Sequence, residues 1–135
     1  MPIIQYRAGF KYQLVDQLIA STQIRVLYPV ETAFLKLETD GTLTIQPGYA
    51  WDGPSGITID TKSFMRGSLF HDAVYQLLRE GKLIIPDGRK LADKLLRAIC
   101  IEDGMWKMRA WWVYRAVRAF GKPSSIHGRK LLEAP

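Results

Sequence analysis

The apolar and polar positions of this chain follow two different periods, and the change falls near residue 63. Before it, short apolar runs predict strands over residues 23–30, 33–38 and 43–45. The dipeptide Asp40-Gly41 separates the last two runs and predicts a hairpin with a type I′ turn, because that turn needs positive φ at both central residues. The first part of the chain is therefore expected to be an antiparallel sheet.

After residue 63 the apolar positions recur every three to four residues, which predicts helices. The first helix is expected over residues 63–80, with Ser63 as its N-cap and Gly81 as its stop. The second is expected over residues 87–104 and the third over residues 105–120. Strands first and helices after them indicate an α+β fold.

The length of 135 residues predicts one domain, covering residues 1–135. Within it we expect mainly strands in 1–47, a glycine-rich loop in 48–62, three helices in 63–121 and a basic tail in 122–135. The loop is expected to be structured, because GYAWDGPSG at residues 48–56 fits neither period.

The composition favours a folded protein made in the cytoplasm. Apolar residues make up 47% of the chain and charged residues 24%, which is ordinary for a soluble domain. We find neither a run of roughly 18 apolar residues nor the basic-then-apolar start of a secretory signal. Cys100 is the single cysteine, so an intramolecular disulfide and C-x-x-C metal chemistry are excluded.

The net charge of +6 is concentrated near the end of the chain. Residues 105–135 hold seven of the 19 Lys and Arg residues but only one of the 13 acidic residues, Glu133. Such a segment is typical of a surface that meets lipid phosphate, nucleic acid or an acidic protein face, and also of a solvated basic helix without a partner.

Two helical residues could form a general-base pair. His71 falls on the apolar face of the first predicted helix, and Asp93 lies at the edge of the apolar face of the second. If the two helices pack antiparallel, Asp93 reaches the inward-facing His71. An aspartate that orients a histidine serves general-base catalysis, but the same pair is also a common structural ion pair. The spacing leaves both interpretations open.

A cation site is a second hypothesis from the residues. Asp52 lies in the glycine-rich loop beside Gly53, and such loops can direct backbone carbonyls at an ion. Calcium prefers six to eight oxygen ligands, and loop carbonyls together with Asp72 could supply several of them. The alternative is a tight turn in which Asp52 caps its own backbone.

The third predicted helix combines a core face with a basic, aromatic surface. Its core face is expected to contain Trp106, Ala110, Val113, Val117 and Phe120. Trp111 lies instead among Lys107, Arg115 and Arg118. A tryptophan among cations suits a lipid interface or a subunit interface of a homo-oligomer; nucleic acid is less favoured, because one aromatic ring is not a stacking platform.

Three motifs in one order carry a first resemblance. The chain has Gly48, Asp52 and Ser55 as G-x-x-x-D-x-x-S, then FHDAVYQLL, then Ala92-Asp93 in RKLADKLLRAI. In this it resembles a family of small phage and prophage proteins whose function is unknown. That resemblance implies a phage-encoded protein, located in the virion or the host cytoplasm, with other virion or tail proteins as partners.

A second resemblance concerns mechanism. PGYAWDGPSG followed by HDAVYQLLREGK is similar to the calcium loop and H-D-x-x-Y helix of phospholipases that cut the sn-2 ester, especially the parvovirus type. It implies that His71 activates water, Asp93 orients His71 and Tyr75 braces the pair. It also implies that Asp72 and carbonyls near Gly53 hold calcium, and that the substrate is a phospholipid membrane.

Three hypotheses remain open from the sequence. The first is a calcium-dependent, phospholipase-like ester hydrolase acting at a bacterial membrane. The second is a non-catalytic virion or tail protein in which the His–Asp pair is structural and His71 is closed off from solvent. The third is a cell-wall hydrolase in which Asp52 and His71 bind a transition metal directly.

Overall fold

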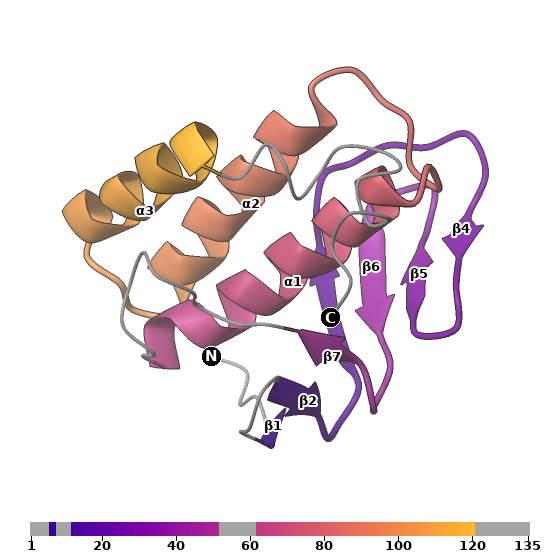
Figure 1. Ribbon diagram of the computed structural model, residues 1–135, viewed down its shortest axis with the longest axis horizontal. Helices are drawn as coiled ribbons and strands as arrows, with labels where there is room; N and C mark the ends of the chain where they lie inside the picture. The colour runs from indigo at the N-terminus through magenta and orange to yellow at the C-terminus, as the bar shows by residue number, and fades with distance from the viewer. Residues whose placement is uncertain (1–5, 8–11, 52–61, 121–135) are drawn as a thin grey trace. The chain divides into compact units, whose positions relative to one another are not determined.

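The structure is a computed structural model, and it describes residues 6–7, 12–51 and 62–120. Contacts within the chain divide it into two compact units, the strand unit Met1–Asp52 and the helix unit Gly53–Pro135. Strands precede helices, as Figure 1 shows, so the predicted α+β fold class is confirmed.

The strand unit contains two antiparallel sheets. The larger sheet has the order β3-β6-β5-β4, and β6 pairs with β3 on one side and β5 on the other. The smaller sheet has the order β1-β2-β7. The strands are β1 Tyr6–Arg7, β2 Tyr12–Leu14, β3 Leu18–Ser21, β4 Val30–Glu31, β5 Leu35–Leu37, β6 Thr42–Ile45 and β7 Ala50–Trp51.

The alternation of the central strands explains how this unit buries its core. Successive strand residues point to opposite faces of a sheet, so Leu35 and Leu37 of β5 share one face. Both are buried, as are Leu43 and Ile45 of β6, whereas the residues between them are partly exposed. These two strands are the second and third predicted ones, with shifted ends.

The hairpin between β5 and β6 is present, but its turn differs from the predicted type. Gly41 has a φ of 96°, whereas Asp40 is not among the residues with positive φ. The Gly41 N–H donates to the Glu38 carbonyl, and the Glu38 N–H donates to the Thr42 carbonyl. This is a three-residue loop in which a tight turn is followed by a left-handed glycine. Asp40 accepts a hydrogen bond from the Thr42 N–H instead of adopting positive φ.

The predicted strand over residues 23–30 is wrong. The strand in this region ends at Ser21, because Thr22 bonds to Gly41 through both its N–H and its hydroxyl group. Gln23 then adopts a φ of 64°, which a strand does not accommodate. The loop prediction for residues 48–56 also needs correction, since Ala50–Trp51 pair with β2 as strand β7.

The helix unit contains α1 Lys62–Arg79, α2 Gly88–Glu102 and α3 Lys107–Phe120. Figure 1 shows α2 lying between the other two helices. All three predicted helices are present within a few residues of their expected ends. Ser63 lies inside the first turn of α1, so its predicted N-cap role is wrong. None of these described helices has the length and apolarity needed to cross a bilayer.

Glycines end α1 and α2 in the same way. Gly81 has a φ of 71°, its N–H donates to the Leu78 carbonyl, and the next N–H donates to the Leu77 carbonyl. Gly104 has a φ of 100° and is followed by the same pair of bonds, to Ile101 and Cys100. Both ends are Schellman motifs, which need a left-handed residue that glycine adopts without strain.

Helices α1 and α2 pack closely and antiparallel. Gly67 makes this approach possible, because an added Cβ would lie 2.9 Å from the Cys100 sulfur and 3.0 Å from a Leu96 methyl group. Cys100 is fully buried there, and burial raises the pKa of its thiol to about 12.

A buried ion pair joins the ends of the same two helices. The Arg66 guanidinium donates to both carboxylate oxygens of Asp103, with Nε–Oδ2 and Nη2–Oδ1 distances of 2.9 Å, and also bonds to Glu102. Arg66 and Asp103 are both buried, so this bidentate geometry satisfies charges that would otherwise destabilise the core.

The single-domain prediction stays a prediction, because the arrangement of the two units is not determined. The candidate site described next lies wholly within the helix unit.

Candidate functional site

The carboxylate of Asp93 is the centre of a buried polar network formed by all three helices. Its Oδ1 atom accepts hydrogen bonds from His71 Nε2 at 2.7 Å and from the Tyr75 hydroxyl at 2.6 Å. Its Oδ2 atom accepts one from Arg118 Nη1 at 3.1 Å. Asp93 is fully buried, so these three donors replace the water that an ionised carboxylate would lose on burial.

Helix geometry places His71 and Tyr75 on the same carboxylate oxygen. They are four residues apart on α1, so they lie on one face, and their ring centroids are 4.1 Å apart. The antiparallel packing of α2 brings Asp93 opposite that face. The sequence therefore predicted correctly that Asp93 reaches His71; whether the pair is catalytic is a separate matter.

The bond to Asp93 fixes the roles of the two His71 ring nitrogens. An ionised carboxylate only accepts, so Nε2 carries a proton and donates it to Asp93. Nδ1 is then the atom that gains or loses a proton, and it lies 3.7 Å from Asp72 Oδ1. That distance is an ion-pair separation.

Two opposing effects act on the pKa of His71. Burial disfavours the charged imidazolium and lowers the pKa, but the carboxylates of Asp72 and Asp93 stabilise the charge. The carboxylates outweigh burial, and the pKa of His71 lies above its ordinary value. Burial and the bond to Asp93 also raise the pKa of Tyr75, so its hydroxyl group remains a donor.

The contact of Arg118 with the site was not predicted from the sequence. Arg118 was expected on the surface with Trp111, Lys107 and Arg115, yet its guanidinium is bonded to the buried Asp93 and its side chain is 31% exposed. Its backbone carbonyl accepts a hydrogen bond from Arg89, which also donates to the Val117 carbonyl at 3.2 Å. Arg89 thereby supplies donors to carbonyls at the end of α3 that the helix leaves unpaired.

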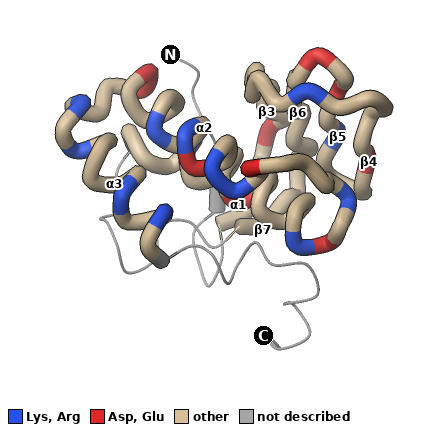
Figure 2. The backbone as a smooth tube through the Cα atoms, turned by 90° about the horizontal axis from the view of Figure 1, so that it is seen from above, with Lys and Arg blue, Asp and Glu red and all other residues tan. Residues whose placement is uncertain are grey.

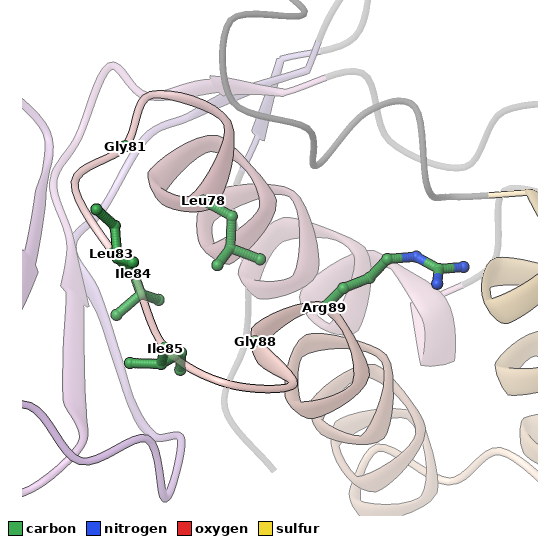
Figure 3. A pocket seen from close by; sticks show the side chains of 7 residues that line it. All are labelled: Leu78, Gly81, Leu83, Ile84, Ile85, Gly88 and Arg89. Atoms are coloured by element: carbon green, nitrogen blue, oxygen red, sulfur yellow. The ribbon is translucent and has the colours of Figure 1, made fainter.

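An apolar hollow of about 360 Å³ lies beside the connection between α1 and α2. Figure 3 shows the side chains of Leu78, Leu83, Ile84 and Ile85 around it, while the Arg89 side chain extends away from them. Leu78 is seven residues from His71, roughly 10 Å along the helix. Arg89 lines the hollow and also bonds to the end of α3, so the hollow adjoins the residues around the Asp93 network, but its lining contains no His, Cys, Asp or Glu side chain.

The described residues do not form a metal site by themselves. They contain no group of three or more His, Cys, Asp and Glu side chains placed to hold one ion. Asp72 is the one predicted calcium ligand that the structure describes; Asp52 and Gly53 lie outside the described residues. Direct metal binding by His71 would have to use Nδ1, since Nε2 is bonded to Asp93. The calcium and transition-metal hypotheses stay predictions.

The basic and aromatic residues of α3 are largely on the surface. Trp111 is 45% exposed, and the Arg115 guanidinium lies over its ring at 5.7 Å from the centroid. Lys107 is exposed as expected. The core prediction holds for Ala110, Val113 and Val117 but is wrong for Trp106, which precedes the first helical residue and is 82% exposed.

The sequence reasoning missed two further exposed apolar side chains of α3, Met108 and Trp112. Their signal was available, because both fall on the side of the helix opposite Val113 and Val117.

Comparisons of this chain with protein-family models, curated proteins and solved structures find no match.

Proposed function

We propose that this protein hydrolyses an ester bond of a lipid and that His71 is the general base. The observation that carries the proposal is the shared oxygen of Asp93, which holds both His71 Nε2 and the Tyr75 hydroxyl. This arrangement fixes the imidazole tautomer, stabilises its protonated form and leaves Nδ1 to take a proton.

The reaction follows from these atoms. Nδ1 of His71 removes a proton from water, and the water oxygen attacks the carbonyl carbon of the ester. The tetrahedral intermediate then collapses, the bond to the alcohol oxygen breaks, and the imidazolium returns the proton to that oxygen. Asp93 stabilises the imidazolium between these steps, and Tyr75 keeps Asp93 in position.

The lipid substrate is inferred from the phospholipase resemblance and from the exposed tryptophans beside cations on α3. The phage setting is inferred from the three-motif resemblance alone. Calcium is left as a variable of the experiment, because Asp72 is the one candidate ligand among the described residues.

A second candidate is a non-catalytic virion or tail protein with a structural His–Asp pair. One observation favours it: the His71 side chain is only 9% exposed, and a buried histidine satisfied by a carboxylate needs no further role. A hydrolase additionally needs space for water at Nδ1.

Fatty-acid release from phospholipid vesicles tests the proposal, with calcium or with chelator present. We compare the wild type with His71→Gln and with Asp72→Asn, which tests the calcium ligand. The control is Gln76→Ala, because Gln76 bonds to Glu80 on the same helix. Hydrolysis is supported if the wild type and Gln76→Ala release fatty acid and His71→Gln does not. No release by folded wild type in either condition removes the hydrolase proposal.

A further inference from the structure

The outward-facing side of α3 carries two cations beside exposed apolar side chains. At roughly 100° per residue, Lys107, Trp111 and Arg115 fall within an arc of about 80°. Met108 and Trp112 continue this arc on one side, and both are more than half exposed. The opposite side of α3 packs into the core through Ala110, Val113 and Val117. We call the five exposed residues the outer arc.

The outer arc carries one sign of charge. Helix α3 contains no acidic residue, and Figure 2 shows Lys and Arg positions along it. The Arg118 guanidinium is paired with the Asp93 carboxylate, so Lys107 and Arg115 are the cations that the outer arc presents. A partner with a negatively charged surface would complement this charge.

The apolar half of the arc decides between kinds of anionic partner. Trp112 is 65% exposed and Met108 is 74% exposed, a cost in water that burial in a partner would remove. Trp111 and Trp112 pack edge to face with centroids 6.2 Å apart, so their rings do not form parallel platforms for stacked bases. A two-fold contact between two copies of the arc would place like charges against each other.

We propose that the outer arc docks α3 on a bilayer surface containing anionic lipid, with the helix axis parallel to the bilayer. Lys107 and Arg115 then meet headgroup phosphates, while Met108 and Trp112 enter the boundary between headgroups and acyl chains. The inference deepens the proposed function and draws its lipid setting from it, but its test does not require ester hydrolysis.

Vesicle sedimentation of the full chain in chelator tests the docking. The probes are vesicles of phosphatidylglycerol and phosphatidylcholine in equal amounts, and vesicles of phosphatidylcholine alone. We expect binding to the anionic vesicles that weakens as salt is raised, because the headgroup contacts are screened. Trp112→Ser should weaken this binding about tenfold.

A matched control comes from the strand unit. Tyr28 is 79% exposed, so Tyr28→Ser removes a comparable exposed aromatic ring and should leave binding unchanged. Both variants change surface residues, and circular dichroism verifies that each is folded. Equal loss of binding in the two variants would contradict a role for the outer arc.

Of three further outcomes, the first two overturn the docking proposal and the third overturns hydrolysis alone. If the wild type does not bind anionic vesicles but binds RNA, the partner of the outer arc is nucleic acid. Wild type that ignores vesicles but forms a dimer, lost in Trp112→Ser, assigns it to a second copy. Vesicle binding that persists in His71→Gln, without fatty-acid release by wild type, refutes hydrolysis and retains the docking.

Discussion

At the scale of single residues, the carboxylate of Asp93 on α2 accepts hydrogen bonds from side chains of both other helices. The pair of His71 and Asp93 was predictable from the sequence, because both residues lie on inward faces of helices joined by a short connection. Arg118 could not be placed, because its helical position groups it with Lys107 and Arg115 on the surface. A long side chain and the packing of α3 on α2 decide that it reaches Asp93 instead.

Removing the charge of Asp93 tests how much this network stabilises the fold. Asp93→Asn removes the negative charge and replaces one of the two acceptor oxygens with an NH2 donor, which then faces a donor of the network. We expect a loss of about 3–5 kcal/mol in the free energy of unfolding. Urea denaturation measures it. The control is Asp87→Asn, at an exposed residue with a φ of 55° that asparagine tolerates, expected to change stability by less than about 0.5 kcal/mol. Similar values for both variants would show that the network contributes little.

The raised pKa of His71 predicts a direction of pH dependence. The folded protein binds this proton more tightly than the unfolded chain, whose reference pKa is 6.5. The resulting stabilisation is complete below that pH and is lost as pH rises through the folded pKa. The stability difference between wild type and His71→Gln, measured by urea unfolding in chelator from about pH 5.5 to 9, should therefore shrink with increasing pH. A difference that grows over this range would mean that the folded state holds His71 neutral.

At the scale of elements, the helices were predictable because their signals are local. Gly81 and Gly104 each mark the end of a helix, since the left-handed conformation there favours glycine. The prediction of a strand over residues 23–30 was wrong, because a distant contact fixes the chain at Thr22, just before that segment. Thr22 bonds to Gly41, 19 positions away, and no local pattern records that bond.

The close approach of α1 and α2 makes Gly67 sensitive to one methyl group. Gly67→Ala gains about 1 kcal/mol in helix propensity but overpacks the contact with Cys100, which costs about 1–3 kcal/mol. We expect a net destabilisation of about 1 kcal/mol in urea unfolding. In a Cys100→Ala background the sulfur is absent but the contact with the Leu96 methyl group at 3.0 Å remains, so the same change should cost less than in the wild type. Destabilisation of equal size in both backgrounds would locate the strain elsewhere.

At the scale of the whole molecule, the order of strands and helices and the concentration of positive charge could be predicted, but the mutual dependence of the two units could not. Periodicity and charge are properties of segments, whereas cooperativity depends on contacts between segments. The described strands of the strand unit are two to four residues long, and such short strands are marginally stable alone.

A core substitution in the strand unit tests the predicted single domain. Leu37 is fully buried, and Leu37→Ala should cost about 2–5 kcal/mol. All helices among the described residues belong to the helix unit, so circular dichroism at the helical band reports that unit. In a single cooperative domain, Leu37→Ala lowers the urea midpoint of the helical signal. An unchanged midpoint, with Leu96→Ala as the positive control, would mean that the units unfold independently.

Because Cys100 is buried, the rate at which its thiol reacts reports how often the surrounding helices open. This thiol is the single one in the sequence, is fully enclosed beside Gly67 and has a pKa raised to about 12. A chromogenic disulfide reagent can therefore reach a reactive thiolate only when the core that Cys100 shares with α1 and α3 opens. The labelling rate counts those openings, and a compound that stabilises the closed helix unit slows it. Ligands of the helix unit can thus be recognised before any reaction has been observed.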